Sequence, residues 1–157
     1  KFKDTSLVLS VLVFNDTIIR ASILEKEARR EEDMRLVAGI IENRLERGMF
    51  LQIDATVAYG ACLRRFKDLD ISIYKYCDVS QIGVASEIKI DGPYNTYTRI
   101  GLPLGPIANP GITAIRAVLD PIKSDYLYYL STRDGSQIIY SKTAVEHATN
   151  RRKYLGL

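Results

Sequence analysis

The spacing of apolar residues predicts helices over much of the chain. Residues 33–48 have apolar positions three and four apart, which is the pattern of one helix face. These positions are Met34, Val37, Ala38, Ile41 and Leu45. Gly48 fits the C-terminal cap of this helix. The apolar run over residues 6–14 does not distinguish a helix from a strand, but Asn15 and Asp16 then favour an N-cap and predict a helix to about residue 30.

The second half of the chain predicts a β-hairpin between two helices. Apolar residues 112–119 predict a short helix that Pro121 ends, and residues 69–82 are ambiguous, with a short helix as one interpretation. The stretch "DYLYYLSTRDGSQIIYSK" has two β-rich runs on either side of Asp134 and Gly135, which is typical of a hairpin. Thr143 and Glu146 then favour the start of a basic helix that ends near residue 155. Together these elements predict one α+β domain over residues 1–157.

A long loop separates these two halves. The stretch "GPYNTYTRIGLPLGPIANPG", residues 92–111, contains four of the five prolines and four of the ten glycines, and forms little helix or sheet. Disorder is typical of segments with low hydrophobicity and high charge, whereas this segment is apolar and aromatic. It therefore predicts an ordered loop that shapes a surface.

Composition narrows the function classes. The 157 residues are 46% hydrophobic and 26% charged, and the net charge of +3 is too small to indicate nucleic-acid binding. Cys62 and Cys77 form no metal motif, and the single histidine, His147, excludes a His-rich zinc site. A disulfide between the two cysteines and a pair of buried free thiols both stay open. No run of about 20 apolar residues predicts a membrane span.

One carboxylate is placed unexpectedly by the helical periodicity. With Ile18 at zero and about 100° per residue, Glu25 lies about 20° from the centre of the apolar arc, whereas Glu27 lies on the opposite, polar side. Glu25 is then either a structural acid paired with an arginine such as Arg44 or Arg99, or a general acid. Burial would raise its pKa and keep a proton available near neutral pH. Glu27 has the same side chain on the opposite side of the helix and is therefore the natural control for Glu25.

Several polar residues are candidates for binding a sugar. In "LQIDATVAYG", a strand-like backbone would place Gln52, Asp54 and Thr56 on one side, with Tyr59 beyond them; the alternative is that Asp54 caps the following segment. The long loop adds Tyr94, Asn95, Thr96, Tyr97 and Asn109, unless the loop is only structural. His147 is a candidate base, although a lone helical histidine favours a structural role.

Four stretches in series resemble the YceG-like (MltG) family of endolytic murein transglycosylases. They are "ASILEKEA", "NRLERGMFLQIDATVAYG", "GPYNTYTRIGLPLGPIANPG" and the terminal "DG…YSKT…EH", in the family's order over roughly residues 21–147. The resemblance implies that Glu25, the first acid of "EKE", is the catalytic glutamate. It also implies a lysozyme-like glycan cleft, lined by the "LQ.D.TV.YG" and "PYNTY" residues, between a helical lobe and a small hairpin lobe. Four positions depart from the family pattern: Ile53, Ala55, Gln137 and Ala148.

The resemblance implies a reaction without metal, nucleotide or other cofactor. Glu25 would protonate the oxygen between N-acetylmuramic acid and N-acetylglucosamine, and then accept the proton of the muramoyl C6 hydroxyl as a 1,6-anhydro ring closes. The partners would be peptidoglycan glycan strands and cell-wall synthesis proteins, at the extracytoplasmic face of a bacterial membrane. A membrane anchor and a small LysM-like domain would lie outside this chain. The alternatives are a hydrolase that uses Glu25 and Asp54, and a glycan-binding module without catalysis.

Overall fold

The computed structural model describes residues 5–67 and 77–157, which form helices around one small sheet. The helices are α1 (Thr5–Glu27), α2 (Glu31–Glu46), α3 (Asp54–Lys67), the 3-10 turn η1 (Val79–Gln81), α4 (Val84–Glu87), α5 (Ile112–Leu119) and α6 (Ala144–Leu155). The strands β1 (Tyr128–Ser131) and β2 (Ile138–Ser141) form an antiparallel pair. The α+β prediction is confirmed. None of the helices in these two ranges is long and apolar enough to cross a membrane.

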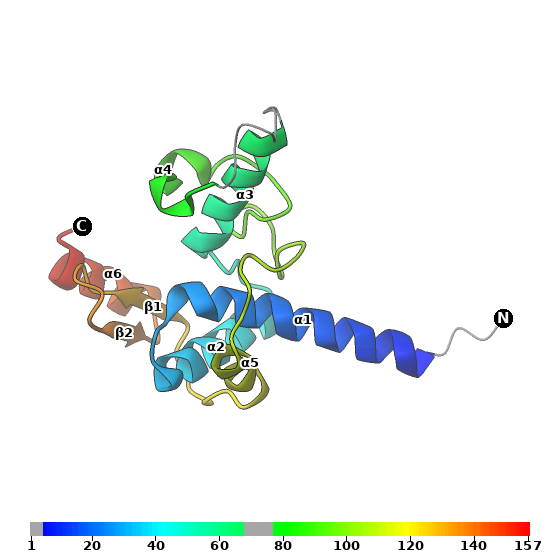
Figure 1. Cartoon of the computed structure of the whole chain (residues 1–157). Coiled ribbons are helices and arrows are strands. Elements are labelled where there is room, and N and C mark those ends of the chain that lie inside the picture. The colour runs from blue at the N-terminus through cyan, green and yellow to red at the C-terminus, as the bar shows by residue number, and fades with distance from the viewer. Residues whose placement is uncertain (1–4, 68–76) are drawn as a thin grey trace.

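Helix α1 is continuous, so the expected N-cap at Asn15 and Asp16 is wrong. The apolar run over residues 6–14 is helical and leads directly into the later part of α1. Thr17 donates its hydroxyl to the carbonyl of Val13 at 2.8 Å, one turn back. The first half of α1 projects from the body (Figure 1), and its residues 11–14 are exposed. The buried residues of α1 described below all lie in its second half.

The packed half of α1 is covered on several sides. It contacts α2, α3 and α5, and the consecutive residues Ala21, Ser22, Ile23 and Leu24 are all fully buried. The long loop is held against this part of α1, because the backbone N–H of Ile107 donates to the Ser22 hydroxyl at 3.0 Å. A helix buried around most of its circumference has no single apolar face.

Helix α2 ends as predicted, with Gly48 in the left-handed region at φ 62°. Its middle crosses a later segment of the chain very closely. A Cβ atom on Gly39 would lie 2.3 Å from the carbonyl oxygen of Ile122, and the backbone N–H of Ile122 donates to the carbonyl of Arg35 at 3.0 Å. Only glycine permits this approach.

The stretch expected to be strand-like instead begins helix α3 at Asp54. Thr96 of the long loop organises this start. Its carbonyl accepts from the N–H of Gln52 at 3.0 Å, and its hydroxyl accepts from the N–H of Ile53 at 2.9 Å. The Thr56 hydroxyl donates to the Ile53 carbonyl at 2.7 Å. These contacts bend the chain into a helix, which periodicity over so short a segment could not show.

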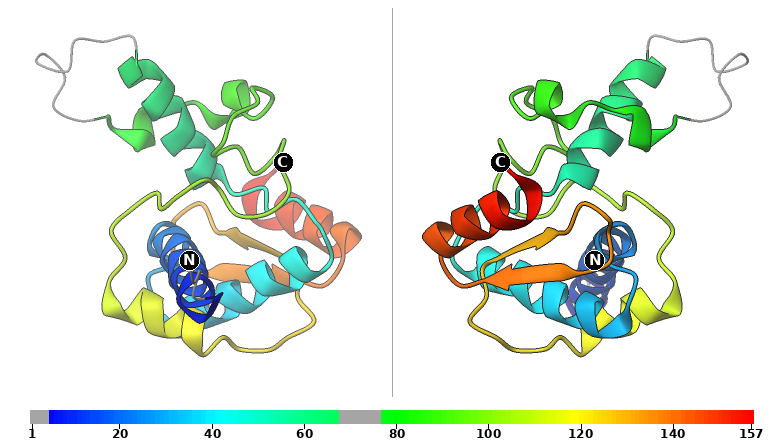
Figure 2. Two further views of the ribbon diagram at one scale, coloured as in Figure 1. Left: turned by 90° about the vertical axis from the view of Figure 1, so that its right-hand side faces the viewer. Right: turned by 90° about the vertical axis from the view of Figure 1, so that its left-hand side faces the viewer.

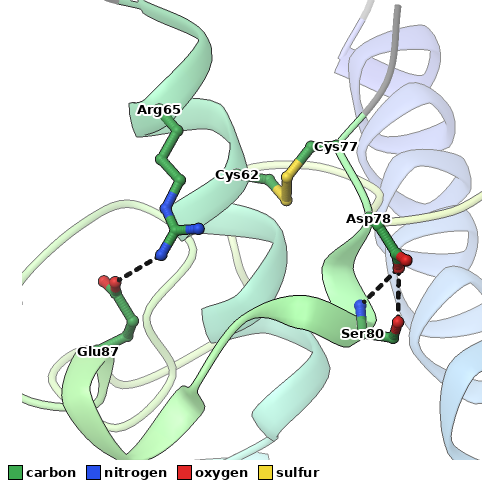
Figure 3. The surroundings of a disulfide bond; sticks show 6 residues. All are labelled: Cys62, Arg65, Cys77, Asp78, Ser80 and Glu87. Atoms are coloured by element: carbon green, nitrogen blue, oxygen red, sulfur yellow. Dashed lines mark hydrogen bonds and ion pairs between the residues drawn. A yellow bond between two sulfur atoms is a disulfide. The ribbon is translucent and has the colours of Figure 1, made fainter.

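A disulfide joins Cys62 of α3 to Cys77, so of the two open alternatives the bonded pair is the one observed (Figure 3). Beside it, Asp78 accepts hydrogen bonds from the N–H and hydroxyl of Ser80 and so caps η1. The ambiguous stretch 69–82 falls mostly on residues 68–76, which lie outside the described residues. Its final part forms the single turn η1. This small lobe of α3, η1 and α4 stands above α1 (Figure 1).

The predicted hairpin and final helix are both confirmed. Tyr128 pairs with Ser141 and Ser131 pairs with Ile138, and the connecting turn has Gly135 at φ 67°. Thr143 caps α6 by accepting from the N–H of Glu146 at 3.1 Å. Helix α6 packs against both strands (Figure 2). Strand β1 thereby lies between α6 and the end of α1, where the candidate site is found.

Candidate active site

Glu27, the last residue of α1, lies on the wall of a cavity of about 560 Å³. Its carboxylate oxygen Oε2 accepts a hydrogen bond from the hydroxyl of Tyr129 on β1, at 2.8 Å. Burial raises the pKa of Glu27 to about 7; the Tyr129 hydrogen bond opposes this rise, and the negative charge of Asp54 adds to it. Glu27 can therefore hold a proton near neutral pH.

The environment of Glu27 follows from the residues one turn before it. Side chains three and four residues apart are neighbours on a helix, so Glu27 lies beside Leu24 and Ile23, which are both fully buried. Tyr129 covers the carboxylate from the hairpin. The expectation that Glu27 lies on a solvated face is wrong, because the apolar arc was centred on Ile18, which is only partly buried.

Glu25 is exposed, which corrects the expectation of a carboxylate within the apolar arc. It lies beside the small residues Ala21 and Ser22, whose short side chains do not cover it. Its Oε2 accepts a hydrogen bond from the N–H of Gly111 at 3.0 Å, at the end of the long loop. The suggested pairing with Arg44 or Arg99 is also wrong, since Arg44 binds backbone carbonyls and Arg99 pairs with Asp91 at 2.8 Å.

Two cavities meet at Glu27. The first, of about 560 Å³, lies toward α2, α3 and α6; the second, of about 460 Å³, lies toward the start of α2 and the turn of the hairpin. Glu27 and Ser131 line both of them, and Glu25 and Gln137 line the second. A chain-like ligand could therefore extend to both sides of the Glu27 carboxylate.

Asp54 and Tyr97, both expected at the site, meet in the first cavity. The hydroxyl of Tyr97 donates to Oδ1 of Asp54 at 2.5 Å. Burial, and then this hydrogen bond to the Asp54 carboxylate, raise the pKa of Tyr97 above its ordinary value, so the phenol stays protonated. Asp54 is thus fixed as an acceptor at the start of α3, close enough to Glu27 for its charge to act there.

Gln52 also lines this cavity, on an exposed and unusual backbone. Its φ of 52° makes it the one non-glycine residue in the left-handed region among residues 5–67 and 77–157. Such conformations cost free energy and are concentrated at functional sites. The hydrogen bond from its N–H to Thr96 holds the backbone in place, and the side chain stays available to a ligand.

Thr56, Asn95 and Thr96 line neither of the two cavities that contain Glu27. All three are buried. The hydroxyls of Thr56 and Thr96 are 2.9 Å apart and hydrogen-bonded to each other. The Asn95 amide donates to the carbonyls of Ile88 and Ile90 at 3.0 and 2.8 Å, and its oxygen accepts from the N–H of Tyr97. These side chains satisfy backbone groups of the loop and position Tyr97.

The remaining candidates, Tyr59 of α3 and Tyr94 and Asn109 of the long loop, also lie apart from the Glu27 carboxylate. The rings of Tyr59 and Tyr94 contact each other, with 5.0 Å between their centroids, and pack against the core. Neither tyrosine lines either cavity that contains Glu27, and the exposed Asn109 does not either. Of the long loop, Tyr97 alone lines these two cavities.

The sequence interpretation missed the contribution of Arg44 and Tyr129 to the cavity. Arg44 is 7% exposed, and its guanidinium donates to the carbonyls of Leu127 and Leu51, both at 2.6 Å. It thereby joins the residue that precedes β1 to the segment before α3. The sequence pattern predicted a hairpin position for Tyr129 and no role at the site. Strand alternation in "YLYYL" would have placed Tyr129 on the opposite face from Tyr128, but not against Glu27.

His147 occupies the α6 side of the cavity. Its ring stacks on Tyr128, with 5.2 Å between centroids and 22° between planes. Burial, and then the positive charges of Arg151 and Arg44, lower its pKa, so the ring is neutral at pH 7. Its Nδ1 atom is buried and makes no hydrogen bond within the described part of the chain. In that same part, no three metal-binding side chains lie close enough together to hold a metal ion.

A carboxyl group that stays protonated near neutral pH in an open groove is how many enzymes donate a proton to a leaving group. The family to which the chain belongs is the YceG-like family, whose model matches residues 3–153. The resemblance seen in the sequence is therefore confirmed.

The chain is 39% identical to the endolytic murein transglycosylase of Bacillus subtilis, over 87% of this chain and 33% of that protein. It is 32% identical to the endolytic murein transglycosylase of Streptococcus pneumoniae, over 92% of this chain and 24% of that protein. A crystal structure of a yceG-like protein from Listeria monocytogenes superposes with a TM-score of 0.71 at 33% identity, over 92% of this chain and 42% of that one. The chain thus spans a quarter to a third of the length of these curated relatives.

Proposed function

We propose that the protein cleaves glycan strands of peptidoglycan as an endolytic lytic transglycosylase, with Glu27 as the general acid and base. The observation that carries this proposal is the Glu27 carboxyl, whose pKa is raised to about 7 where two open cavities meet. The names of the relatives support the class of reaction. A module that only binds glycan would gain nothing from such an acid.

The proposed reaction uses one carboxyl group twice. Protonated Glu27 donates its proton to the oxygen that joins C1 of N-acetylmuramic acid to N-acetylglucosamine, and the bond from C1 to this oxygen breaks. The Glu27 carboxylate then accepts the proton of the muramoyl C6 hydroxyl while the C6 oxygen bonds to C1. The product ends in a 1,6-anhydro ring, Glu27 is protonated again, and no water is consumed. A pKa near the working pH suits both steps.

Two neighbours adapt Glu27 to this role. Tyr129 fixes the orientation of the carboxyl through its hydroxyl. Asp54 places a second negative charge near the reacting centre, where it would stabilise the positive charge that develops at C1. The cavities on both sides of Glu27 leave room for sugars before and after the cleaved bond, which supports cleavage within a strand.

The assignment to Glu27 is tested by a matched pair of variants. Glu27→Gln should lower the rate of cleavage of purified peptidoglycan by about 100-fold or more, since it removes the proton donor. Glu25→Gln, on the same helix two residues away, should stay within about threefold of the parent. The released fragments are measured by liquid chromatography with mass spectrometry. If Glu25→Gln is inactive and Glu27→Gln is active, the acid is instead Glu25, as the resemblance implied.

A two-carboxylate hydrolase is the second candidate, because the charge of Asp54 acts directly on Glu27. Such an enzyme uses one carboxyl as acid and the other as base or nucleophile, and adds water to the product. The products separate the two reactions. Transglycosylase fragments are lighter by one water and are not reduced by borohydride, whereas hydrolase fragments have reducing ends. A spread of fragment lengths would support cleavage within strands.

We also propose that the protein acts at the extracytoplasmic face of a bacterial membrane. The disulfide between Cys62 and Cys77 supports an oxidising compartment. A membrane anchor and contacts with cell-wall synthesis proteins rest on the family resemblance. The location is tested by labelling the native protein in intact cells with a thiol reagent after mild reduction. Protection of both cysteines until the cells are lysed would contradict it.

A further inference from the structure

The first cavity has a basic side that the proposed bond cleavage does not use. Arg44 on α2 and His147 and Arg151 on α6 line it, and we refer to these three as the basic cluster. The acids Glu27 and Asp54 enter the same cavity from α1 and α3. One cavity therefore contains both the candidate acid and two arginines.

Arg44 provides a fixed positive charge. Its Nε and Nη1 atoms donate to backbone carbonyls, and its guanidinium carbon lies 5.0 Å from the centroid of the Tyr128 ring. No carboxylate pairs with it in the ranges that the structure describes. The Nη2 atom of Arg44 makes no hydrogen bond in these ranges. In the same ranges, His147 Nδ1 is the one buried polar side-chain atom without a hydrogen-bond partner, so the unpartnered Nη2 atom is not buried. Nη2 is thus unpaired but open to solvent.

Arg151 adds a cation that is free to bind a ligand. It lies on α6 one turn after His147, so the two side chains share a face of the helix. Arg151 is exposed and makes no hydrogen bond or ion pair with any residue whose placement is described. The buried Nδ1 of His147 also lacks a partner. Nη2 of Arg44 and the guanidinium of Arg151 therefore have hydrogen-bonding capacity that the described part of the chain does not use, whereas Nδ1 of His147 is sealed.

We propose that the basic cluster binds a carboxylate carried by the muramic acid residues of the glycan strand. This inference rests on the proposed function. N-acetylglucosamine is neutral, but N-acetylmuramic acid has a lactyl group on C3. The lactyl carboxyl is either free or joined to a stem peptide that has carboxylates of its own. A guanidinium presents paired N–H donors that match a carboxylate. Binding at this place would set which sugar has its C1 atom at Glu27.

The test measures binding with the turnover-deficient variant Glu27→Gln as the parent protein. The ligands are glycan strands with stem peptides, strands freed of peptides by an amidase, and the freed strands with their lactyl carboxylates converted to neutral amides. Arg151→Gln and Arg151→Lys are compared with Arg152→Gln. Arg152 is the next residue of α6 and is also exposed, but it does not line the cavity. Its variant loses the same charge.

Arg151→Gln should weaken binding of strands with carboxylates by about five- to tenfold. Arg151→Lys should retain part of the affinity, and Arg152→Gln should retain nearly all of it. The neutral strands should bind all variants alike. If the effect of Arg151→Gln persists after the peptides are removed, the lactyl carboxylate is the ligand. If it vanishes with the peptides, the ligand is a carboxylate of the stem peptide.

The proposal is overturned if Arg151→Gln binds carboxylate strands like its parent, if Arg152→Gln loses as much, or if no strand binds measurably. Cleavage by the unmodified protein is assayed separately. Discrimination between charged and neutral strands without cleavage would contradict the proposed reaction but support the carboxylate site. Cleavage without discrimination between charged and neutral strands would support the proposed reaction but contradict the carboxylate site.

Discussion

Replacing Glu27 by glutamine should make the protein more stable at alkaline pH even as it removes activity. In the unfolded chain the carboxyl ionises near its ordinary pKa of 4.5, whereas in the folded protein its pKa is about 7. Below pH 4.5 the group is protonated in both states and costs nothing. Between pH 4.5 and 7 the unfolded chain releases this proton first, so the free energy of unfolding falls as pH rises.

The size of this effect follows from the two pKa values. A difference of one pKa unit is worth about 1.4 kcal/mol, so the interval from 4.5 to about 7 corresponds to about 3 kcal/mol at most. Glu27 keeps some contact with the open cavity, so we expect about 1–3 kcal/mol. Above pH 7 the group is ionised in both states and the difference stays constant. Glutamine keeps the acceptor for Tyr129 but carries no charge.

The assay is unfolding by urea at pH 4, 6 and 8, for the parent, Glu27→Gln and Glu25→Gln. The stabilisation by Glu27→Gln relative to the parent should be near zero at pH 4 and reach its full value at pH 8. Glu25→Gln should show no such rise, since that side chain is exposed. A constant difference between Glu27→Gln and the parent at all three pH values would refute the raised pKa and with it the choice of acid.

Two further predictions concern pH dependence and the disulfide. The value of kcat/KM should fall as pH rises above about 7, because Glu27 then loses its proton. Asp54→Asn should move this fall to lower pH, because the Asp54 charge raises the pKa of Glu27. Tyr129→Phe should move it to higher pH, because the Tyr129 hydrogen bond lowers that pKa. Shifts of both variants in the same direction would contradict these roles of Asp54 and Tyr129. Reduction of Cys62–Cys77, which are 15 residues apart, should lower the free energy of unfolding by about 3 kcal/mol in guanidinium titrations. Equal free energies of unfolding with and without reductant would show that the disulfide does not stabilise the fold.

The sequence predicted those elements whose signals are local. Gly135 permits the hairpin turn, Thr143 caps α6, and Gly48 ends α2, and each acts within a few residues. The N-cap expected at Asn15 failed because the apolar residues before it are themselves helical, and a helix does not end where a possible cap residue occurs. The same limit applied to "LQIDATVAYG", where Thr96, far along the chain, determines the start of α3.

The exposure of Glu25 and the burial of Glu27 show why periodicity misplaced the buried carboxylate. A helical wheel assumes one buried face, but α1 is covered by several helices, so consecutive residues are buried. The useful signal was narrower: Glu27 follows the large residues Ile23 and Leu24 by four and three positions, and Glu25 follows small ones. The hydroxyl that completes the environment of Glu27 belongs to Tyr129, and no local pattern could have indicated that contact.

The burial of Asn95 and Thr96 could not be predicted from the sequence for a related reason. Asn95 and Thr96 looked like groups that bind sugar, because asparagine and threonine offer suitable hydrogen bonds. In a long loop without regular structure, many backbone N–H and carbonyl groups need partners. Asn95 and Thr96 provide them and are buried. Side-chain chemistry alone does not reveal whether such residues serve a ligand or the backbone.

The hydrogen bond between Tyr129 and Glu27 joins residues 102 positions apart, and this has a consequence for the time at which the site forms. During synthesis α1 emerges from the ribosome long before the hairpin does. Until then Tyr129 cannot cover the Glu27 carboxyl, so the burial that raises its pKa is incomplete. A chain that stops before residue 129 would also lack the hydrogen bond that orients this carboxyl. On the proposed mechanism, the acid would therefore be assembled only after β1 has packed against α1, and shorter chains should not cut the polymer.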